Sequence, residues 1–149
     1  MKYIIIFLFI GMALSLNAQQ TEETRVINNS ADQQDSVETR ELPKVKEKEK
    51  LKVVTKMEEY EEVQEALVVQ QDEIKKISLA LIVEKGTSKK RARKLGDHFL
   101  REAMSHFDGE NKPRKKIGKS LYDYMISICT DRNVILMGTK IPDAETITW

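Results

Sequence analysis

Residues 53–81 read VVTKMEEYEEVQEALVVQQDEIKKISLAL, and the spacing of their apolar side chains decides which fold the sequence predicts. Apolar residues recur at every seventh position, at Val53, Tyr60, Leu67, Ile74 and Leu81. Such a repeat places a narrow apolar stripe along one side of a helix. Lys85 and Gly86 follow, a cation and a glycine of the kind that ends helices. The stretch therefore predicts one long helix.

Two further apolar stripes follow toward the C-terminus. Thr87 or Ser88 can cap a second helix that ends at Asp108 and Gly109, and its apolar positions are Ala92, Leu95, Phe99, Ala103 and Phe107. A third set begins after Pro113 and again has helical spacing, with Ile117, Leu121, Met125 and Ile128. These stripes predict two more amphipathic helices.

The C-terminal residues have a different pattern of apolar side chains, which favours β-structure. Residues 134–137 (VILM) form a continuous apolar run, and residues 146–149 (TITW) alternate between polar and apolar. They could form a hairpin on the helices, or recruit residues 51–55 as a third strand. The expected fold class is mainly α (α+β): about three amphipathic helices with a small C-terminal β element. Residues 51–149 would form this single domain, after a disordered polar and charged leader and linker at residues 19–50.

The N-terminus predicts export. Lys2 precedes an apolar run of about 14 residues that ends at Asn17 and Ala18, which is typical of a secretory signal peptide at residues 1–18. The run is shorter than the roughly 20 residues of a membrane-spanning helix, although an uncleaved anchor is the alternative. Gln19 stands where a bacterial lipoprotein would carry its lipidated cysteine. We therefore expect cleavage near Ala18 and a periplasmic or secreted product without a stable membrane anchor.

Charge is balanced overall, at +1, but is arranged in blocks of alternating sign. Such blocks favour contacts within the chain or between copies over attraction to a polyanion. Cys129 is the single cysteine, so no intramolecular disulfide can form. Its apolar neighbours indicate a buried thiol, and a reactive thiol is the alternative.

Two basic clusters are the candidate anion-binding residues: Arg91, Arg93, Lys94, Arg114, Lys115 and Lys116. Both lie at expected helix starts, where the helix dipole favours negative charge, so an anion there would relieve an unfavourable arrangement. The favoured alternative is that these bases pair with the acidic residues 58–65. Nucleic acid is not the expected ligand, because no aromatic residues are interleaved with the bases.

His98, Glu102 and His106 are spaced four apart and would lie on one side of the second helix. A metal ion would need further ligands that the sequence does not supply, so two histidines paired with carboxylates are the favoured interpretation. No catalytic motif such as GxSxG, GxGxxG, HExxH or CxxC occurs, and no cofactor is expected.

Together these observations predict a small exported helical protein, bacterial and non-enzymatic, that acts through protein–protein contacts or as a structural envelope protein. The helix over 53–81 would be the surface for self-association. The alternative is a polyanion-binding module that takes lipid phosphate, acidic glycan or nucleic acid at its basic helix starts.

Overall fold

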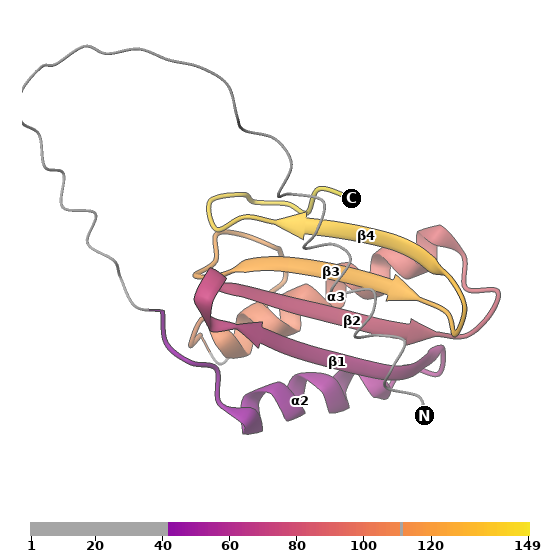
Figure 1. Cartoon of the computed structure of the whole chain (residues 1–149), viewed down its shortest axis with the longest axis horizontal. Helices are drawn as coiled ribbons and strands as arrows, with labels where there is room; N and C mark the ends of the chain where they lie inside the picture. Colours follow the sequence, from indigo (N-terminus) through magenta and orange to yellow (C-terminus); the bar gives the residue numbers. More distant parts are fainter. Residues whose placement is uncertain (1–41, 111) are drawn as a thin grey trace, which may run out of the picture. The chain divides into compact units, whose positions relative to one another are not determined.

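A computed structural model of the chain describes residues 42–110 and 112–149. Two helices, α2 (Glu47–Glu58) and α3 (Lys89–Phe107), pack on a sheet of four strands. The strands are β1 (Val63–Gln71), β2 (Lys76–Val83), β3 (Asp123–Cys129) and β4 (Val134–Lys140), and a short 3-10 turn, η1 (Asp72–Ile74), joins β1 to β2. Figure 1 shows α2 running along β1 and α3 behind the sheet.

The sheet is mixed, with strand order β1-β2-β3-β4. The outer pairs β1–β2 and β3–β4 are antiparallel, whereas the central pair β2–β3 is parallel. Parallel neighbours need a long crossover connection, and α3 supplies it. Alternate residues of β2 (Ile77, Leu79, Leu81) therefore lie beside Tyr124, Ile126 and Ile128 of β3 and face the helices. One continuous core joins these residues to Val53, Met57, Leu95 and Phe99.

The expected fold class is wrong: the described residues form two helices and a four-stranded mixed sheet, an α/β fold. The long helix over 53–81 does not exist, because α2 ends at Glu58 and most of the remaining residues form β1, η1 and β2. β-branched side chains are dense between Val63 and Val83, and such residues favour strands. The turn between the strands carries no glycine; Lys75 itself takes the left-handed conformation, with φ 53°. The sequence therefore showed no break where the hairpin turns.

The third predicted helix is also wrong. Residues 112–122 are irregular and β3 follows them. Met125 and Ile128, three residues apart, fit a helix as well as a strand, but in β3 they lie on opposite faces. Residues 51–55, a possible third strand, belong to α2.

Other expectations are confirmed. The helix predicted after Ser88 is α3, and the Ser88 hydroxyl accepts a hydrogen bond from the Arg91 N–H at 3.2 Å. The run 134–137 lies in β4, although it pairs with β3, and the last residues contribute one bridge between Thr139 and Thr148. The predicted linker boundary is wrong, because residues 47–50, assigned to the disordered linker, are the first turn of α2.

The predicted signal peptide 1–18 and the leader residues 19–41 lie outside the described residues. Among the residues that are described, no helix combines the length and the apolar character that crossing a bilayer requires.

Candidate anion-binding cleft

The indole of Trp149 lies where two elements carry glycine instead of a side chain. A Cβ atom on Gly96 of α3 would lie 2.4 Å from the Trp149 ring, and one on Gly138 of β4 would lie 2.7 Å from it. Carbon atoms do not approach so closely, so both glycines are needed for the ring to reach its position. The ring N–H donates to Asp97 Oδ1 at 3.2 Å, which fixes the orientation of the indole.

Beside this ring is a cleft of about 450 Å³ that gathers basic side chains from two parts of the chain. Arg93 and Arg101 come from α3, and Lys115 and Lys116 come from the loop before β3. The guanidinium of Arg93 lies 5.9 Å from the centroid of the Trp149 ring. We call this the Trp149 cleft; its lining residues are Arg93, Asp97, Arg101, Lys115, Lys116, Ile117, Glu145, Thr146, Ile147 and Trp149.

The Trp149 cleft has an excess of positive charge. Four basic side chains line it against two acidic ones, Asp97 and Glu145. Asp97 already accepts the hydrogen bond of Trp149. Within the described part of the chain, no ion pair engages Arg93, Lys115 or Lys116. These three cations are therefore available to an anionic group.

The loop that carries Lys115 and Lys116 is held by its neighbour Arg114. The Arg114 guanidinium pairs with Asp108 (Nη2–Oδ2, 3.1 Å) and with Glu110, and it donates to the carbonyl of Lys119 at 2.9 Å. Burial raises the pKa of the Asp108 carboxyl, even though the Leu121 N–H and Arg114 both favour its charged form. Arg114 therefore positions the loop, and its guanidinium N–H groups are already engaged by these partners.

A buried lysine ties the other end of this loop to β4. Lys140 is 1% exposed, and its Nζ donates to Ser120 Oγ at 2.7 Å and to the carbonyl of Ile141 at 3.0 Å. Burial lowers the pKa of Lys140. The N–H of Ser120 also donates to the Pro142 carbonyl at 2.9 Å. These bonds connect the 112–122 loop to the segment that leads to Trp149.

The structure divides the six residues of the anion-binding prediction. Arg93, Lys115 and Lys116 line the Trp149 cleft, whereas Lys94 is exposed outside it. Arg91 donates two hydrogen bonds to Glu62, at 2.7 and 3.0 Å. This pairing is the one expected from the alternative interpretation, in which the bases pair with residues 58–65. Residues 114–116 are not at a helix start, because no helix follows Pro113.

Sequence reasoning missed seven of the ten residues that line the cleft, among them Arg101 and Trp149. Arg101 had a signal: Arg93, Asp97 and Arg101 are spaced four apart and so share one flank of α3. The position of Trp149 depends on glycines in two different elements, and no local pattern in the sequence reports such a contact.

The histidines of the metal hypothesis lie in separate places. His106 Nδ1 is 3.2 Å from Glu49 of α2, and His98 Nε2 is 3.6 Å from Glu102. His98 also packs edge-on against Tyr60, and burial lowers its pKa. In the described ranges, no group of three or more His, Cys, Asp or Glu side chains could hold a metal ion.

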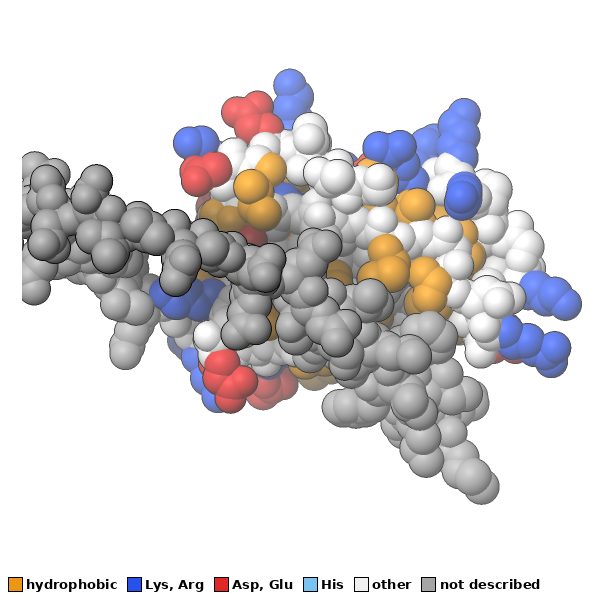
Figure 2. Space-filling model, turned by 45° about the horizontal axis from the view of Figure 1, so that its top comes forward, with side chains coloured by type: hydrophobic (Ala, Val, Ile, Leu, Met, Phe, Trp, Pro, Cys, Tyr) orange, Lys and Arg blue, Asp and Glu red, His pale blue; other side chains and the backbone are white. Residues whose placement is uncertain are grey.

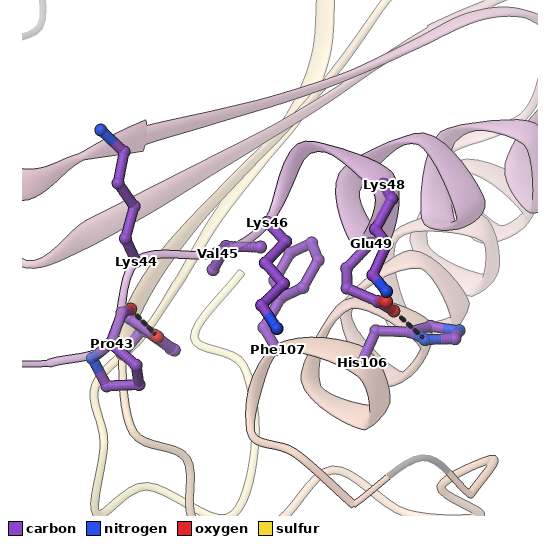
Figure 3. A pocket seen from close by; sticks show the side chains of 9 residues that line it. Pro43, Lys44, Val45, Lys46, Lys48, Glu49, His106 and Phe107 are labelled. Atoms are coloured by element: carbon purple, nitrogen blue, oxygen red, sulfur yellow. Dashed lines mark hydrogen bonds and ion pairs between the residues drawn. The ribbon is translucent and has the colours of Figure 1, made fainter.

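A second cavity, of about 420 Å³, lies where the chain enters α2 (Figure 3). Lys44, Lys46 and Lys48 line it, together with the Glu49–His106 pair. Lys44 pairs with Asp72 at 3.5 Å, so part of this charge is already compensated. The Trp149 cleft is therefore the stronger candidate for an anion.

The comparisons with known proteins add no family: no protein-family model, no curated protein and no solved structure matches this chain.

Proposed function

We propose that this protein is a non-enzymatic binding module that holds an anionic group of its ligand in the Trp149 cleft. The observation that carries the proposal is the set of three cations, Arg93, Lys115 and Lys116, which line the cleft without an ion-pair partner among the described residues. The anionic group can belong to a small molecule or to a protein partner.

The chemistry of the cleft favours a carboxylate or a phosphate. Lysine ammonium groups bind oxyanions as point charges, and an arginine fork can donate two parallel hydrogen bonds to one. The apolar side chains of Ile117 and Ile147 and the Trp149 ring line the same cleft, so they can contact a carbon skeleton attached to the anion. Because Arg93, Lys115 and Lys116 are exposed, binding should weaken as salt is added.

Trp149 is the single tryptophan of the chain, so its fluorescence reports on the cleft directly. We expect inorganic phosphate or citrate to change the emission of Trp149 in a saturable way. The K115A/K116A double variant should bind about two- to thirtyfold more weakly, since each exposed ion pair contributes about 0.2–1 kcal/mol.

The matched control is K89A/K90A, which removes two exposed lysines at the start of α3 that do not line the cleft. It should leave the titration unchanged. An emission that does not respond to either anion, or an equal loss in both double variants, would contradict the proposal.

Export of this module is a second part of the proposal, supported by the sequence of residues 1–18. The mass of the product isolated from the envelope or medium of its native cell should correspond to a chain that begins at Gln19. A product that retains Met1 to Ala18 would exclude cleavage there.

A further inference from the structure

The helices cover one face of the sheet, and the two middle rows of the opposite face are built from uncharged side chains. Strand pairing places Val69, Ser78, Met125 and Thr139 in one row across the four strands. The next row holds Leu67, Ala80, Ser127 and Met137. We call this surface the open face. Val69 is 39% exposed and Met137 is 47% exposed, so large apolar side chains reach its surface.

Where grey atoms leave this side of the molecule visible, Figure 2 shows orange hydrophobic side chains among white atoms, with blue and red side chains mainly around the margin. An exposed apolar patch with a polar margin is typical of a surface that binds another protein. We infer that the open face binds the open face of a second copy of this chain, in a dimer whose two-fold axis runs parallel to the strands between β2 and β3.

The strand directions support this symmetry. The outer strand pairs β1–β2 and β3–β4 are antiparallel and the central pair β2–β3 is parallel. The up-and-down order of the strands is therefore the same whether it is read from β1 or from β4. The two-fold axis would therefore place β2 on β3 of the second copy, and β1 on β4. The two strands of each stacked pair would run in the same direction. Aligned sheets of this kind pack about 10 Å apart.

Charge and side-chain size are complementary under the same operation. Lys76 and Asp123 are register partners at one end of the open face, and no ion pair joins them within the described chain. The two-fold axis would place each Lys76 against Asp123 of the second copy. In the next row it would place the larger Met125 over the small Ser78, which is only 5% exposed.

The area of the open face suits a weak dimer. Four strands spaced about 4.8 Å apart and four rows of alternate residues give a footprint of about 500 Å² per copy. The total of about 1000 Å² lies at the lower end of the range for specific interfaces. We therefore expect dissociation constants in the micromolar range or above. The Trp149 cleft contains none of these open-face residues, so the dimer and the proposed anion binding can fail independently.

Sedimentation velocity of the purified chain, from micromolar to submillimolar concentration, tests the inference. The wild-type chain should approach twice the monomer mass. The T139R variant, which puts a charge on the exposed part of the open face, should remain a monomer. T55R is the matched control, because Thr55 is exposed on α2 at the opposite side of the sheet.

The charge arrangement gives a second test. K76D alone should weaken the dimer at least about tenfold, and K76D/D123K should restore it, because the reversed pair is again complementary. Circular dichroism checks that each variant is folded. A wild-type chain that stays monomeric, a T139R variant that dimerises like T55R, or a double variant without rescue would overturn the inference.

Discussion

At the scale of single residues, Gly138 decides where Trp149 can lie. A Cβ atom there would lie 2.7 Å from both Ile147 and the Trp149 ring. We expect G138A to displace the ring, to shift its emission to longer wavelength and to cost about 1–3 kcal/mol of unfolding free energy. G118A is the control, since nothing lies within 4 Å of that position. If both variants have wild-type emission, the packing of Trp149 is different from that described.

His98 gives stability a dependence on pH. Burial lowers its pKa in the folded state, so below pH 6.5 the unfolded chain binds more protons at this site than the folded chain does. Stability should therefore fall as the pH decreases from about 6.5 toward the folded-state pKa. Glu102 opposes the lowered pKa, while Arg101 and Lys56 reinforce it. Urea unfolding at pH 7.5 and 5.5 should show a larger loss for the wild type than for H98N, and equal losses would exclude this role.

The candidate site was predictable from the sequence to the extent that it depends on composition. Lys115 and Lys116 were predicted from an expected helix start that does not exist, and the part of the prediction that remains is the basic run itself, which attracts anions wherever the fold puts it. The pairing of Arg91 with Glu62, 29 residues away, agrees with the alternative that the bases pair with residues 58–65, but only the packing of α3 against α2 brings the two side chains together. Burial and pairing of a charge depend on such long-range contacts.

At the scale of secondary-structure elements, α2 is a helix that tertiary packing stabilises, since most of its residues are charged and only Val53 and Met57 are buried. M57A should therefore cost about 2–5 kcal/mol, because the side chain is fully buried in the core. L51A should change the unfolding free energy by less than about 0.5 kcal/mol, because Leu51 is 65% exposed. Chemical denaturation of both variants measures the difference, and equal effects would mean that α2 is not docked as described.

The same element explains why the fold prediction failed. The apolar repeat of residues 53–81 includes Tyr60, Leu67 and Leu81, which lie in a turn, on the open face and in the core, respectively. The repeat was thus a coincidence of spacing, because its five residues lie in α2, a turn, β1, η1 and β2. The alternation of Ile77, Leu79, Leu81 and Val83 was the informative pattern, but the apolar residues between them hid it.

At the scale of the whole molecule, the described chain should unfold as one unit. Trp149 packs against α3 and β4, while the helices that dominate the far-ultraviolet dichroism share one core with all four strands through residues such as Met57, Ala66 and Ile126. Urea transitions followed by Trp149 fluorescence and by dichroism should therefore coincide, with an m-value of about 1–3 kcal/mol/M. An earlier fluorescence transition would mean that the Trp149 segment detaches before the sheet unfolds. The Trp149 cleft would then be a locally unstable part of the molecule, and anion binding would have to order it first.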